Sequence, residues 1–269
     1  MERHPSARRE LVLLAVVLLA STRLADGPVL WLLAALVLAT IAAGALNVLG
    51  SVSAAGVPVE ALILPSVAGA AAVGALQLIP PSFWTILALA VAGLLIDRTL
   101  ALEARLEAAI HGPTPDDRQT VAFYAVVVAA LAFVGVAALV PGALETGGST
   151  AEAVLSASDV VIVALADGIV AFLLGYRLAA LRSTELRSVA LSALTYAVVI
   201  AIGAGATRVI PVEGYLGPAL LALVFFLWDR IQGSTGRRTR DPNWLWEIGV
   251  LVVLGIAVVL LNLNLGGGS

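Results

Sequence analysis

The sequence predicts an all-α, polytopic membrane protein with about nine transmembrane helices. Hydrophobic residues make up 61% of the 269 residues and charged residues only 12%, whereas soluble domains contain about 25% charged residues. All fifteen basic residues are arginines, and most lie in four short segments. The apolar stretches between those segments are close to the roughly 20 residues that a helix needs to cross a bilayer. We therefore expect a single transmembrane domain over residues 1–265.

Each apolar stretch should be a helix, because backbone polar groups cannot remain unsatisfied in lipid. The expected spans are residues 10–25, 28–49, 57–79, 82–98, 118–140, 152–178, 185–208, 213–229 and 244–264. The fourth helix should continue beyond the membrane and lie at the interface, since Leu102, Leu106 and Ile110 recur at helical spacing. Residues 266–269, Gly-Gly-Gly-Ser, have the composition of a flexible linker.

Turn and capping residues support these boundaries. The run Thr114–Asp117, Thr-Pro-Asp-Asp, provides an N-cap, a proline at the first helical position and acidic residues in the first turn of the fifth span. Ser149 and Glu152 have capping-box spacing before the sixth span. Pro80 and Pro81 predict a tight turn between the third and fourth spans.

The arginines also predict the orientation, because cytoplasmic loops of membrane proteins carry an excess of positive charge. If the N-terminus is cytoplasmic, thirteen arginines fall on the cytoplasmic side, and only Arg23 and Arg208 fall outside. Nine spans then place the C-terminus outside. We expect a multi-pass protein of a cell membrane, of the prokaryotic plasma-membrane type.

Two segments of the chain resemble each other. Ala72–Ala75 leads through Pro80 to Asp97-Arg98, and Ala201–Ala204 leads through Pro211 to Asp229-Arg230, about 131 residues later. Residues 10–111 and 116–232 are thus candidate parallel repeats of a four-helix unit, with the helix at 244–264 appended. Parallel repeats are a known transporter layout. The alternative is that apolar helices resemble one another through composition alone.

Ionisable side chains at membrane depth are costly, so they are candidate functional groups. Asp167 lies midway along the sixth span, and Asp159 lies about two turns nearer the outside. The seventh span brings Thr195 and Tyr196 to mid-depth and Arg208 to its outer end. We expect these five residues to form an ion- or proton-binding site, in which Asp167 faces Tyr196 or Thr195 and Asp159 pairs with Arg208.

A structural interpretation of the same residues stays open. A neutral Asp167 would hydrogen-bond across a helix pair, which also holds membrane helices together. Asp159 and Arg208 would then form an ion pair without a transport role. Glu60 and Asn47, at the inner ends of the third and second spans, are weaker site candidates. Glu60 is expected to pair with Arg98 or Arg177.

Several chemistries lack the residues that they need. The chain has no cysteine and only two histidines, so we expect neither a disulfide nor a transition-metal site. No phosphate-binding loop, zinc-binding motif or nucleophile elbow occurs, and we expect no cofactor. The arginines follow helix ends rather than one basic face, which argues against nucleic-acid binding.

Three functions fit this pattern. The first, which we favour, is a secondary carrier or permease with a proton- or cation-binding Asp167. The second is a non-catalytic scaffold or subunit that packs against partner proteins or against a second copy of itself. The third is a lipid-modifying enzyme using Glu60 or Asp167 as acid or base, for which the sequence offers the least support. The expected partners are membrane lipids and, for the second function, other protein subunits.

Overall fold

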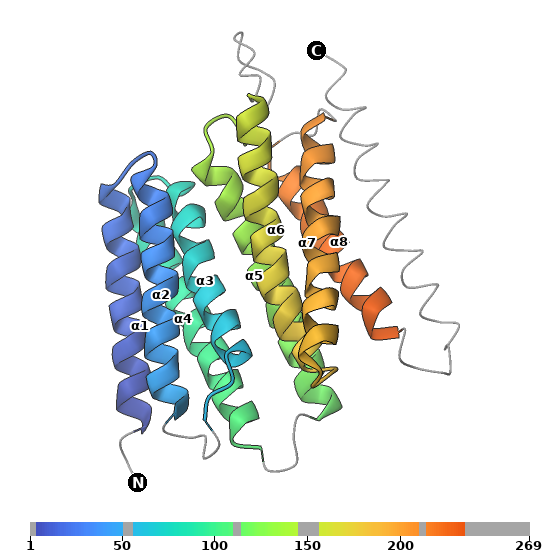
Figure 1. The fold of residues 1–269 in the computed structure, drawn as a ribbon. Helices are drawn as coiled ribbons and strands as arrows, with labels where there is room; N and C mark the ends of the chain where they lie inside the picture. Colours follow the sequence, from blue (N-terminus) through green and yellow to red (C-terminus); the bar gives the residue numbers. More distant parts are fainter. Residues whose placement is uncertain (1–3, 51–55, 110–113, 145–155, 210–213, 235–269) are drawn as a thin grey trace.

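The computed structural model describes residues 4–50, 56–109, 114–144, 156–209 and 214–234 (Figure 1). Only the backbone is described for four of them, His4, Pro5, Arg208 and Val209. All the regular elements in these ranges are helices, as the sequence predicts. They are α1 (His4–Ser21), the short 3-10 helix η1 (Thr22–Leu24), α2 (Val29–Gly50), α3 (Glu60–Gln77), α4 (Phe83–Glu107), α5 (Pro115–Leu139), α6 (Ala157–Ala180), α7 (Leu186–Val209) and α8 (Leu216–Ser234).

Seven of these helices, α2 to α8, are long and apolar enough to cross a membrane. Helix α1 carries Arg8, Arg9 and Glu10 near its start and is not among the seven, although it runs alongside α2 and packs against α2 and α4 (Figure 1). The expected ninth span, residues 244–264, and the linker-like residues 266–269 lie outside the described residues. The count of nine therefore stays a prediction.

The helices form two units of four, α1–α4 and α5–α8, which lie side by side (Figure 1). In the first unit each helix packs against the next, and α1 also packs against α4. In the second unit the same pairs are in contact, with α5 against α8. The two units meet chiefly through α3, which packs against both α5 and α6.

Helix α3 can occupy this central place because its sequence is rich in small residues. A Cβ atom added to Gly74 would lie only 2.1 Å from the carbonyl oxygen of Gly135 in α5, so the two backbones touch directly. Close approach of this kind, through small residues, is a main source of helix association in membranes. At the α3–α5 crossing the two units are therefore in direct backbone contact.

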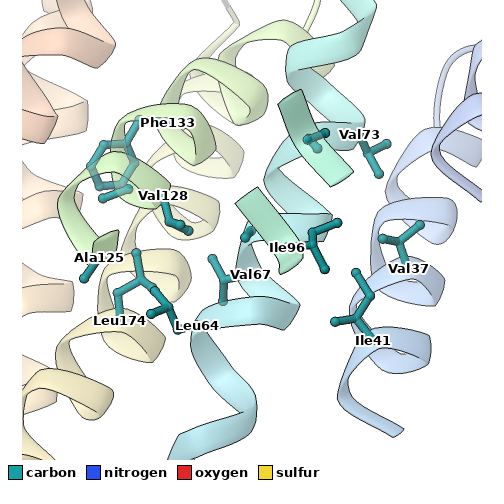
Figure 2. Packing of buried hydrophobic residues seen from close by; sticks show 14 of the residues in the cluster. Val37, Ile41, Leu64, Val67, Val73, Ile96, Ala125, Val128, Phe133 and Leu174 are labelled. Carbon is teal, nitrogen blue, oxygen red and sulfur yellow. The ribbon is translucent and has the colours of Figure 1, made fainter. Parts of the chain in front are cut away.

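One hydrophobic cluster runs through both units (Figure 2). Val37 and Ile41 of α2 face α3 (Figure 2). Leu64 and Val67 of α3 lie between α2 on one side and α5 and α6 on the other (Figure 2). On the far side Phe133 of α5 is fully buried and packs edge-on against the ring of Phe225 in α8. The two units thus share a continuous core.

Several predicted boundaries are confirmed. Thr114 caps α5: its hydroxyl accepts the backbone N–H of Asp117 at 3.2 Å, and the Asp117 carboxylate accepts the N–H of Thr114 at 3.1 Å. The prolines at 80 and 81 lie in the turn between α3 and α4. Helix α4 continues to Glu107 as expected, while Ile110 lies outside the described residues. The predicted cap of Ser149 and Glu152 also lies outside them.

Candidate functional site

Asp167 occupies the position that the sequence predicts. It is the eleventh of the 24 residues of α6, and it is only 1% exposed. The next residue, Gly168, faces α7 so closely that an added Cβ atom would lie 3.4 Å from the carbonyl oxygen of Ala197. The carboxyl group is therefore held inside the bundle, at the middle of a membrane-spanning helix.

The Tyr196 and Thr195 hydroxyls are expected from the sequence to contact Asp167. Both form hydrogen bonds to other groups instead. The Tyr196 ring packs on Gly175, two turns further along α6 than Asp167, and its hydroxyl donates to Asp229 at 2.7 Å. Side chains lean toward the N-terminus of their helix. Helix α7 begins at the end of the bundle that carries Arg8, Arg105, Arg177 and Arg182, which we call the arginine-rich end. Tyr196 therefore points away from mid-membrane.

Thr195 is likewise engaged with α8. Its hydroxyl oxygen accepts hydrogen bonds from the Trp228 indole at 3.1 Å and from the Gln232 amide at 2.9 Å. The same hydroxyl donates to the carbonyl of Ser192 within α7 at 2.7 Å. Thr195 thus joins α7 to α8.

Asp159 lies in the first turn of α6, at the end of that helix farthest from Arg177. The Ser156 hydroxyl donates to its carboxylate at 2.6 Å, and the Asp159 N–H in turn donates to the Ser156 hydroxyl at 3.2 Å. Asp159 is therefore part of a capping box at an exposed helix start. The side chain of Arg208 lies outside the described residues, so the pair between Asp159 and Arg208 stays a prediction.

The most deeply buried ion pair joins Glu103 of α4 to Arg177 of α6. The Arg177 Nε donates to one carboxylate oxygen at 2.9 Å and Nη2 donates to the other. The two side chains are 0% and 5% exposed, respectively. The expected pairing of Glu60 with Arg177 is wrong: Arg177 pairs with Glu103 through Nε and Nη2, and Glu60 forms no ion pair within the described ranges.

Sequence reasoning missed Glu103 because its neighbours suggested an interfacial helix. A signal was nevertheless present: all but one of the buried residues in this part of α4, namely Ile96, Thr99, Leu100, Glu103 and Leu106 but not Leu102, follow the three- and four-residue spacing of one helix face. Placing Glu103 on that face would have indicated a buried acid in need of a basic partner.

A second polar cluster lies at the same end of the bundle. Arg182 follows α6 and donates to the Tyr196 hydroxyl at 3.1 Å and to the Asp229 carboxylate of α8. Burial alone would lower the pKa of Arg182, but the adjacent Asp229 and Tyr196 raise it above its usual value. The guanidinium therefore stays charged and ties the end of α6 to α7 and α8.

Two further ion pairs lie at this end. Arg8 of α1 donates to both carboxylate oxygens of Asp97 in α4 at 2.6 Å, and Arg105 donates to Asp117 at 2.7 Å. All four ion pairs in the described ranges thus lie at the arginine-rich end and connect different helices or their ends.

The polar residue Arg23 and the weaker site candidates Asn47 and Glu60 occupy the two ends of the bundle. Arg23 caps α3 by donating to the carbonyls of Leu76 and Ile79 at 2.8 and 2.9 Å, where a cation suits the helix C-terminus. Asn47 lies exposed in the last turns of α2, and Glu60 begins α3 half-buried. Asn47 and Glu60 thus lie at helix ends, whereas Asp167 lies at the middle of α6.

Two cavities accompany these polar groups. An apolar cavity of about 330 Å³ lies between the two units and is lined by residues such as Trp31, Val67, Gly135 and Ile169. A polar cavity of about 550 Å³ lies at the arginine-rich end, between the ends of α4 and α6 and the start of α5. Within the described part of the chain, no group of three or more histidine or acidic side chains could hold a metal ion.

Comparison with known proteins adds no family to this description. No protein-family model, curated protein or solved structure gives a significant match to the chain. Its helices identify it as a multi-pass membrane protein on length and composition.

Proposed function

We propose that this protein is a secondary carrier of a cell membrane in which Asp167 binds a proton or a cation. The observation that carries the proposal is a carboxyl group that is 1% exposed at the middle of a membrane-spanning helix. Acidic side chains at this depth are rare, and they commonly mark ion or proton pathways.

The division into two similar units supports the same proposal. The units α1–α4 and α5–α8 share one set of helix contacts, which favours a duplication of residues 10–111 in residues 116–232. Carriers built from repeats work by rocking one repeat against the other around a central site. The backbone contact of Gly74 with Gly135 and the apolar cavity beside it would suit such a movement.

A second candidate function is a membrane scaffold. The observation that favours it is that each of the four ion pairs in the described ranges connects two helices or helix ends. Polar side chains used in this way serve rigidity rather than transport. The two functions differ in what they require of Asp167, because only a carrier needs its carboxyl group to exchange a proton or cation with water.

The test is Asp167→Asn, with Asp26→Asn as a matched control at an exposed position. The amide has nearly the shape of the neutral acid, so both variants should fold, as judged by gel filtration and thermal unfolding. The proteins are reconstituted in vesicles that contain a pH-sensitive dye, and a potassium diffusion potential is imposed with and without sodium. We expect pH-dependent proton entry with the wild type and Asp26→Asn, and none with Asp167→Asn.

Infrared spectroscopy during a pH titration gives a readout that needs no transported substrate. The absorption of a protonated carboxyl group should change with pH in the wild type, and that change should be lost in Asp167→Asn and kept in Asp26→Asn. If the spectra of the three proteins titrate alike and Asp167→Asn leaves the flux unchanged, the proton site is wrong and the scaffold is the better function.

A further inference from the structure

The polar cavity at the arginine-rich end is lined by three arginines that the carrier proposal does not use. Arg118 of α5, Arg177 of α6 and Arg182 line its wall, together with the hydroxyl residues Ser183 and Thr184. Its volume of about 550 Å³ is within the range of small-molecule sites.

Two of the guanidinium groups are held rigidly and still have free donors. Arg177 uses Nε and Nη2 for Glu103, while its Nη1 donates to no group in the described part of the chain. Arg182 uses Nη1 and Nη2 for Tyr196 and Asp229, and its Nε has no acceptor in those same ranges. A carboxylate behind a ligand-binding cation orients it, and such preorganisation lowers the cost of binding.

The third guanidinium group, that of Arg118, is exposed and forms no ion pair within the described ranges. It lies in the first turns of α5, so it can approach a ligand without breaking a contact of the fold. One acid, Glu107, lies on the same wall. Glu103 and Asp229 balance the charges of Arg177 and Arg182, so the cavity is distinguished by the number of N–H and O–H donors among its lining residues rather than by net charge.

We propose that this cavity binds a phosphate group. A phosphate offers several acceptor oxygens in different directions, and guanidinium groups match it well in geometry and charge. The depth also fits, because α6 ends at Ala180 and α5 begins at Pro115 beside the cavity. This is the level at which apolar helix gives way to charged residues and where lipid headgroups lie. The phosphate would belong either to a phospholipid headgroup or to a soluble phosphate ester.

Arg118→Gln is the variant that tests the site, because Arg118 makes no contact on which the fold depends. Arg98→Gln is the matched control, since Arg98 is exposed, carries the same charge at the same end of the bundle and does not line the cavity. The full chain is purified in an uncharged detergent. Native mass spectrometry then measures the retention of phosphatidic acid and of diacylglycerol, which lacks the phosphate.

Calorimetric titration with glycerol 3-phosphate tests the soluble source in the same three proteins. We expect the wild type and Arg98→Gln to bind a phosphate compound, and Arg118→Gln to bind it about tenfold more weakly, the effect of one charge-assisted hydrogen-bonded contact. Retention of phosphatidic acid without binding of glycerol 3-phosphate identifies a lipid headgroup, and the reverse identifies a soluble ester.

Two results would overturn the proposal. The first is a wild type that retains phosphatidic acid no better than diacylglycerol and shows no heat with glycerol 3-phosphate. The second is an equal loss of binding in Arg118→Gln and Arg98→Gln, which would mean attraction to surface charge without a built site. Equal melting temperatures of the three proteins would show that the comparison concerns binding and not folding.

Discussion

Glu103 in α4 accepts two hydrogen bonds from Arg177 in α6, so a buried ion pair ties the first four-helix unit to the second. The partners are 74 residues apart in the sequence. Because both side chains are almost fully buried, each one depends on the other to balance its charge. This relationship gives the first test of how the two units are held together.

Removing the charge of one partner should lower the free energy of unfolding much more than removing both charges. Glu103→Gln or Arg177→Gln alone leaves an uncompensated buried charge and should cost about 3–5 kcal/mol of stability, whereas the double variant should recover much of that loss. Thermal or denaturant unfolding of the purified protein measures the three values. Arg105→Gln is the control: Arg105 is 72% exposed, so water solvates its charge, and its loss should cost only about 0–1 kcal/mol. Additive losses in the double variant would contradict a direct pair.

The α3–α5 crossing should tolerate no side chain larger than hydrogen. Gly74→Ala would place a Cβ atom 2.1 Å from the Gly135 carbonyl oxygen, so the helices must separate and lose contacts along α3. We expect a lower melting temperature and a loss of about 1–3 kcal/mol, as for an overpacked core.

Gly205→Ala provides the matched control for this crossing. It is the same substitution in helix α7, at a glycine with nothing within 4 Å of the added Cβ atom. Since alanine favours a helix over glycine by about 1 kcal/mol, this variant should be at least as stable as the wild type. Equal destabilisation of the two alanine variants would argue against backbone contact at Gly74.

The Tyr196 hydroxyl should matter for stability even though it lies away from Asp167. Tyr196→Phe removes the donor to Asp229 and the acceptor for Arg182, and unsatisfied buried polar groups cost about 1–3 kcal/mol. Tyr215→Phe, at a residue that is 59% exposed, should leave the melting temperature unchanged. A Tyr196→Phe protein as stable as the wild type would mean that water replaces the hydroxyl.

The orientation can be tested directly, because the chain contains no cysteine and each introduced cysteine is the sole thiol. Asp26→Cys lies in the exposed turn before α2, and Glu185→Cys lies in the exposed turn between α6 and α7. By the positive-inside rule, a membrane-impermeant maleimide added to whole cells should label Asp26→Cys and not Glu185→Cys. The reverse pattern would place the N-terminus outside.

Local chemistry was enough to predict the helices. Long apolar runs can only be helical in lipid, and Thr114 with Asp117 specifies the start of α5 through hydrogen bonds within one turn. Asp167 could likewise be placed inside α6 by counting residues from the ends of an apolar run. These features depend on residues that are neighbours in the chain, so periodicity and capping rules reach them.

Contacts between helices required the three-dimensional arrangement. Hydropathy does not say which face of α4 meets α6, so the partner of Glu103 could not be chosen among the arginines. Counting residues along α7 gives the depth of Tyr196 but not the direction of its side chain. That side chain leans toward the N-terminus of α7 and packs on Gly175. The α3–α5 contact depends on two glycines 61 residues apart, and only the packing of both units brings their backbones together. The depth of a residue in the membrane can be predicted from its own apolar segment. Which helices pack together depends on the surface shapes of all the helices, so it requires the three-dimensional structure.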